Sequence, residues 1–75
     1  MYEIWVSGSP WLKNFDTKEK CRQVIIMYDP DGTVDITVRN SDTSEFLSIK
    51  ELWGSKWVPP VSKNEHVVDW ALEGF

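Results

Sequence analysis

Alternating apolar and polar positions define the first element of the chain. Residues 2–7 place Tyr, Ile and Val at even positions and Glu, Trp and Ser at odd ones. This period of two is typical of a strand with one buried face, and the following Gly8, Ser9 and Pro10 interrupt it. We therefore predict a strand at residues 2–7, with Trp5 on the face opposite its Tyr, Ile and Val side chains.

Two further strands are predicted from runs rich in β-branched residues, 23–28 and 33–39. The sequence Asp-Pro-Asp-Gly at residues 29–32 separates them and suits a tight turn with positive φ at Gly32. A three-residue loop then gives a hairpin whose inward side chains are all apolar: Val24, Ile26, Tyr28, Val34, Ile36 and Val38. In this register Ile25 and Met27 fall on the outer face, beside Trp5.

The helices are predicted from apolar residues at helical spacing between capping signals. Residues 43–53 follow a run of Ser, Thr and Asp and end before Gly54, whereas residues 63–73 begin at a capping-box pattern and carry an apolar stripe. Residues 9–22 fit either a short helix or a structured loop, and the pattern does not decide between them. The chain is thus expected to be a single α+β domain, residues 1–75, with a small antiparallel sheet of about three strands (2–7, 23–28, 33–39) and two helices (about 43–53 and 63–73).

Composition adds that the core must be built from large side chains. The chain has 75 residues, five of them Trp, and a single cysteine, so its core is thin and has no internal disulfide to support it. The lone Cys21, together with the lack of a signal peptide or a bilayer-spanning apolar stretch, predicts a cytoplasmic protein that does not enter membranes.

Charge argues against general affinity for nucleic acid. The net charge is −4, from 8 basic and 12 acidic residues, whereas phosphate binding depends on clustered Lys and Arg. One basic cluster is interleaved with Trp11 and Phe15, a combination suited to single-stranded nucleic acid. A nucleic-acid-binding module that uses residues 11–22 is therefore the alternative function, with these contacts: Lys13, Lys18, Lys20 and Arg22.

No motif in the sequence indicates catalysis, a metal or a cofactor. The acids of residues 29–35 are spaced like those of a calcium-binding loop, but Met27 and Val38 stand where its outer acid ligands belong. Cys21 and His66 are the only thiol and imidazole, too few for a zinc site of the usual type, and nothing in their spacing indicates a catalytic pair. The glycines are isolated, so a phosphate-binding loop is missing too. We expect no enzymatic activity, no metal and no cofactor.

A chain without catalytic residues is expected to act by binding another protein. Small acidic proteins of this kind are often encoded by phages or mobile elements and inhibit or modulate a host protein. We expect the same role for this chain. Either a helix or residues 9–22 cover the outer sheet face, or the face is open to a partner. In the second case the partner-binding residues are predicted there, with two further tryptophans as candidates: Trp5, Ile25, Met27, Trp11 and Trp57. A homodimer through the same face is a further alternative.

Overall fold

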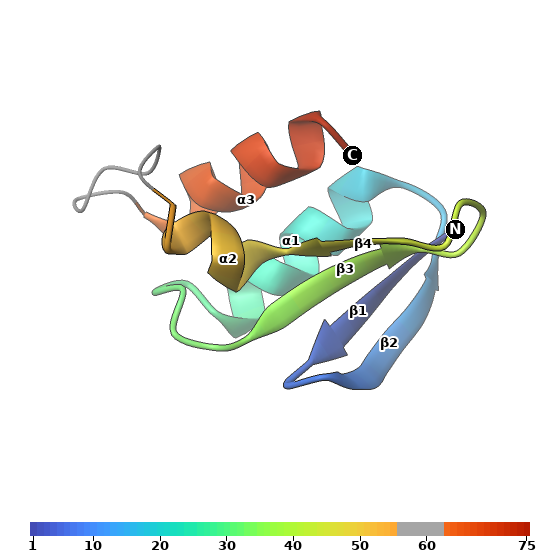
Figure 1. Cartoon of the computed structure of the whole chain (residues 1–75), viewed down its shortest axis with the longest axis horizontal. Coiled ribbons are helices and arrows are strands. Elements are labelled where there is room, and N and C mark those ends of the chain that lie inside the picture. The colour runs from blue at the N-terminus through green and yellow to red at the C-terminus, as the bar shows by residue number, and fades with distance from the viewer. Residues whose placement is uncertain (56–62) are drawn as a thin grey trace.

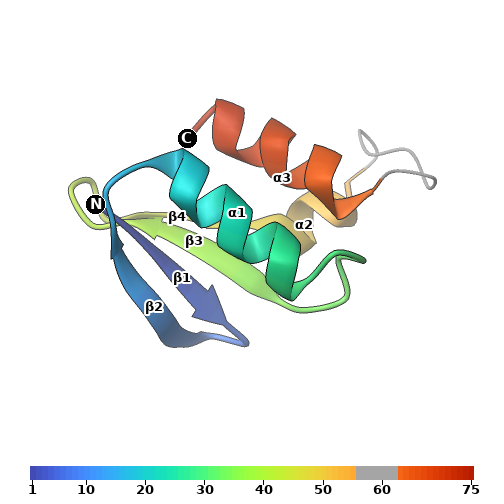
Figure 2. The same cartoon turned by 180° about the vertical axis from the view of Figure 1, so that it is seen from behind.

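The computed structural model describes residues 1–55 and 63–75 and has an α+β fold, as the sequence predicts. One antiparallel sheet has the strand order β2-β1-β3-β4 (Figure 1). Its strands are β1 (Tyr2–Val6), β2 (Ser9–Phe15), β3 (Ile36–Asn40) and β4 (Glu45–Ser48). The helices are α1 (Lys18–Tyr28), α2 (Ile49–Trp53) and α3 (Asn64–Glu73). The helices lie on one face of the sheet, with α1 crossing in front of β3 in Figure 2.

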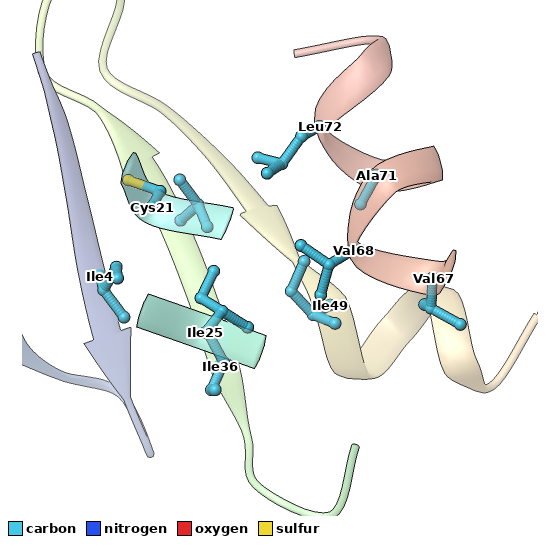
Figure 3. Packing of buried hydrophobic residues seen from close by; sticks show 10 residues of the cluster. Ile4, Cys21, Ile25, Ile36, Ile49, Val67, Val68, Ala71 and Leu72 are labelled. Carbon is cyan, nitrogen blue, oxygen red and sulfur yellow. The ribbon is translucent and has the colours of Figure 1, made fainter. Parts of the chain in front are cut away.

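Strand alternation sends one set of side chains toward the helices. Ile4 of β1 lies opposite Val38 of β3, and both are fully buried. From α1, Cys21 and Ile25 pack against this layer, and α3 closes the core from the other side (Figure 3). The buried hydrophobic residues are Ile4, Cys21, Ile25, Ile36, Val38, Ile49, Val67, Val68, Ala71 and Leu72. The side chains that alternate with Ile4 in β1 and with Val38 in β3 therefore point away from the core, to the outer face of the sheet.

The predicted strand at residues 23–28 is wrong, because these residues belong to helix α1. The Thr17 side chain accepts a hydrogen bond from the backbone N–H of Lys20 and caps the helix, which the strand prediction overlooked. Cys21 and Ile25, four residues apart, share the buried face of the helix. A run of adjacent apolar residues satisfies the helical period as well as the strand period, and here burial against β1, β3 and α3 selects the helix.

The predicted turn at Asp29 to Gly32 is likewise a helix-to-strand connection and does not close a hairpin. Gly32 does have the expected positive φ, 75°. The Asp29 carboxylate accepts hydrogen bonds from the backbone N–H groups of Thr33 and Val34, at 2.9 and 3.1 Å. Asp29, the first of the acids that are spaced like those of a calcium-binding loop, is therefore buried, and its carboxylate fixes the backbone of the residues that follow it.

Two hairpins do occur, at places that the sequence reading missed. Ser7 and Gly8, with φ of 51° and 81°, form the two-residue turn between β1 and β2. Residues 9–15, left open between helix and loop, are thus strand β2. The second hairpin joins β3 to β4, so only residues 49–53 of the helix predicted at 43–53 are helical.

The remaining element predictions agree with the structure within a few residues. Residues 2–6 of the predicted strand 2–7 form β1, and residues 36–39 of the predicted strand 33–39 lie in β3. The predicted helix at 63–73 is α3, which begins at Asn64. In the described part of the chain, no helix has the length and apolar character needed to cross a lipid bilayer.

Candidate protein-interaction face

The outer face of the sheet carries a cluster of four side chains from three strands. Glu3 and Trp5 come from β1, Arg39 from β3 and Phe46 from β4. Register places Glu3 opposite Arg39 and Arg39 opposite Phe46, so these three form one row across the sheet. No helix among residues 1–55 and 63–75 covers this face. We call these four residues the outer-face cluster.

Each member of the outer-face cluster is held by another member. The Trp5 indole N–H donates to Glu3 Oε1 at 3.1 Å, and Arg39 Nη1 lies 3.4 Å from Glu3 Oε2. The Trp5 and Phe46 rings meet edge to face, with centroids 5.3 Å apart and an interplanar angle of 84°. Arg39 Cζ lies 5.6 Å from the centroid of the Phe46 ring, within reach of a cation–π contact. Even so, Phe46 is 55% exposed.

A concavity adjoins the cluster at the β2 side of the sheet. It has a volume of about 430 Å³ and is lined by Glu3, Pro10, Trp11, Leu12 and Lys13. The pairing of β1 with β2 beside it has two register irregularities. Because Glu3 belongs to both features, the concavity, which we call the β2 pocket, is continuous with the outer-face cluster.

The structure places the predicted partner-binding residues in different parts of the fold. Trp5 lies on the outer sheet face, as expected. Ile25 does not, since it is fully buried in the core, and Met27 is 82% exposed but belongs to α1. Trp11 packs its ring on Tyr28 of α1, with ring centroids 4.6 Å apart, and Trp11 is also one of the residues that line the β2 pocket. Trp57 lies outside the described residues.

The structure also shows how the basic residues of the alternative function are used. Lys18 Nζ donates to the Leu72 carbonyl oxygen at 3.0 Å. Lys20 forms an ion pair with Asp16 at 2.8 Å, and hydrogen bonding to this ammonium is the largest cause that lowers the pKa of Asp16. These two cations are therefore already engaged within the fold.

Arg22 is the most heavily paired of the four basic residues. Its guanidinium contacts the carboxylates of Asp69 and Glu65 on α3 and of Glu19 on its own helix. The hydrogen bond that the Arg22 guanidinium donates to the Asp69 carboxylate is the main cause that raises the Arg22 pKa. Of the predicted nucleic-acid contacts, only Lys13 has neither a hydrogen-bond nor an ion-pair partner for its side chain among the described residues.

The only thiol and the only imidazole do not form a reactive pair. Cys21 is fully buried between the sheet and the helices, and desolvation raises its pKa to about 11. His66 lies on the exposed side of α3, where its ring is 6.4 Å from that of Trp70. A buried thiol with a raised pKa is a poor nucleophile. Among the described residues, no group of three or more His, Cys, Asp or Glu side chains is placed to hold a metal ion.

Sequence reasoning missed three members of the outer-face cluster: Glu3, Arg39 and Phe46. Phe46 was counted in the stripe of a predicted helix, although it lies on a strand. Residues 45–48 read Glu-Phe-Leu-Ser, which has no period of two, so no local pattern marked Phe46 as an outward strand residue beside Leu47, which turns toward the core. Arg39 and Glu3 stand at alternating positions of predicted strands, but only the register of β1 with β3 brings them together.

Comparison of the chain with protein-family models, with curated proteins and with solved structures found no match. No relative therefore supplies a function for the outer-face cluster.

Proposed function

We propose that the chain is a protein-interaction module that binds another protein through the outer-face cluster. The observation that carries this proposal is the exposed Phe46 ring, 55% accessible, on a sheet face that no described helix covers. Its neighbours are Trp5 and Arg39. Aromatic residues and Arg are enriched at the centres of protein interfaces, where they dominate the binding energy.

The contacts within the cluster favour binding in a second way. Immobilising a flexible side chain at an interface costs about 0.5–1.5 kcal/mol. Trp5, Arg39 and Phe46 are already held by one another and by Glu3. Docking of a partner on this face therefore costs less side-chain conformational entropy than docking on freely rotating side chains would.

The edges of the sheet favour docking on the face over addition of a strand. Edge strand β2 contains Pro10, which donates no backbone hydrogen bond, and its pairing with β1 is irregular at two places. The other edge, β4, has only four residues. Both edges thus offer little regular backbone for a partner strand, and side chains on the face are the better contact surface.

The size of the face favours a different protein over a second copy. Four strands about 4.8 Å apart and about five residues long present roughly 300–350 Å². A stable interface of standard size buries about 800 Å² on each partner. A partner that reaches beyond the sheet meets this requirement better than a flat contact between two identical faces. By occupying a surface of its partner, such a module would act as an inhibitor or modulator, in the cytoplasm.

The proposal is tested by capture from a lysate of the source organism with three immobilised baits. The baits are the wild-type chain, Phe46→Ser and the control Trp70→Ser, which changes an exposed apolar residue on α3. Circular dichroism of each variant verifies folding. We expect a protein that binds the wild type and Trp70→Ser but not Phe46→Ser, and that survives nuclease treatment. Equal capture by Phe46→Ser, or recovery of nucleic acid alone, would contradict the proposal.

A further inference from the structure

The β2 pocket combines an apolar lining with two charged residues. Its lining includes three apolar residues, Pro10, Trp11 and Leu12, and two charged ones, Glu3 and Lys13. Register places Pro10 opposite Trp5, so the pocket begins beside the outer-face cluster. A volume of about 430 Å³ is large enough for a bulky apolar side chain.

The two charges at the pocket differ in what they still offer to a ligand. The Glu3 carboxylate already accepts from the Trp5 indole through Oε1 and pairs with Arg39 through Oε2. Lys13 has no hydrogen-bond or ion-pair partner among the described residues. The charge left without a partner at this pocket is therefore positive, and it complements a carboxylate.

Glu3 is the one acid among the residues that line the β2 pocket. The four strands contain two acids, Glu3 and Glu45. Glu45 pairs with Asn40, and both residues stand at positions that face the helices, so Glu3 is the strand acid on the outer face. The acids of α1, α2 and α3 belong to the opposite layer. Because charges at the surface are screened beyond about 8 Å at physiological ionic strength, the nearest groups dominate recognition at the pocket.

We infer that the partner presents an acidic-apolar peptide segment, which places an apolar side chain in the β2 pocket and a carboxylate on the Lys13 ammonium. The inference rests on the proposed function and names the chemistry of its partner. A single-stranded nucleic acid shares the negative charge, but it would need several free cations along its backbone. Lys18, Lys20 and Arg22 are engaged within the fold, so a peptide is the better occupant.

Selection of random linear peptides by display on the wild-type chain tests the inference. Selected peptides are synthesised with and without Asp→Asn and Glu→Gln replacements, and their affinities are measured by fluorescence anisotropy. The protein variants are Lys13→Glu, Phe46→Ser and the control Lys63→Glu, which reverses an exposed lysine at the start of α3. Oligothymidylate serves as the nucleic-acid probe.

We expect selected peptides with an acid next to a large apolar residue. Lys13→Glu or removal of the acids should weaken binding about three- to tenfold, since an exposed ion pair contributes up to about 1 kcal/mol and reversal adds repulsion. Phe46→Ser should weaken the same peptides, and Lys63→Glu should not.

The opposite results separate the inference from the proposed function. Peptides that need Phe46 but contain no acids, or that ignore Lys13→Glu, would overturn the inference alone. Failure to select any peptide that depends on Phe46 would count against both. Tight binding of oligothymidylate that Lys13→Glu abolishes would replace the peptide by nucleic acid.

Discussion

Asn64 joins three segments of the chain, so its replacement by Ala is a sharp test of the packing. It is fully buried at the start of α3. Its Nδ2 donates to the Asp29 carbonyl oxygen at 2.6 Å, and its Oδ1 accepts from the Trp53 indole N–H at 2.8 Å. One amide thus ties the end of α1 and the end of α2 to α3.

The magnitude follows from the two groups that lose their partner. Leaving a buried donor or acceptor unsatisfied costs about 1–3 kcal/mol for each group. Because Trp53 is only partly buried, we expect Asn64→Ala to lower the free energy of unfolding by about 2–4 kcal/mol in total. A chain of 75 residues has a stability of about 4–11 kcal/mol. The corresponding fall in Tm is roughly 10–30 °C.

Urea denaturation followed by circular dichroism measures this change. The control is Gln23→Ala, which removes an amide from the exposed side of α1 and should change the stability by less than about 0.5 kcal/mol. A double-mutant cycle of Asn64→Ala with Trp53→Phe should give a coupling energy of about 1 kcal/mol. The reasoning would be refuted by an Asn64→Ala variant as stable as Gln23→Ala, or by zero coupling.

Three further predictions concern the core and its loops. Ile25→Ala should cost about 2–5 kcal/mol and Met27→Ala less than about 0.5 kcal/mol, because one is buried and the other 82% exposed; equal losses in urea denaturation would contradict helix α1. Gly32→Ala should lower Tm more than Gly8→Ala. Both glycines have positive φ, but only a Cβ at Gly32 would lie 2.6 Å from the indole nitrogen of Trp53; an equal fall in Tm would show that backbone strain alone matters. Cys21, with a pKa raised to about 11, has a thiolate fraction of about one in a thousand at pH 8, so a disulfide reagent should react with it far more slowly in the native protein than in urea, and comparable rates would rule out its burial.

Sequence patterns predicted the position of only part of the candidate site. Alternation in residues 2–7 placed Trp5 on the outer face, and the structure agrees with that position. Ile25 was assigned to the same face only because residues 23–28 were taken as a strand, and the helix turns it into the core instead. Phe46 became visible as a site residue only when β4 was placed beside β3.

Local patterns determined the α+β class, strand β1 and helix α3. In β1 Tyr2, Ile4 and Val6 recur with a period of two, and in α3 the apolar stripe follows the helical period, so in each segment one conformation turns this set of side chains toward the core. At residues 24–28 five apolar residues in succession allow either conformation. There the tertiary structure decided, because a strand would place Gln23 on the buried face between Cys21 and Ile25, whereas the helix turns Gln23 outward and sets the two buried side chains on successive turns against the layer formed by the strands and α3. The outer-face cluster was decided in the same way, since it joins three strands whose register no local sequence pattern specifies.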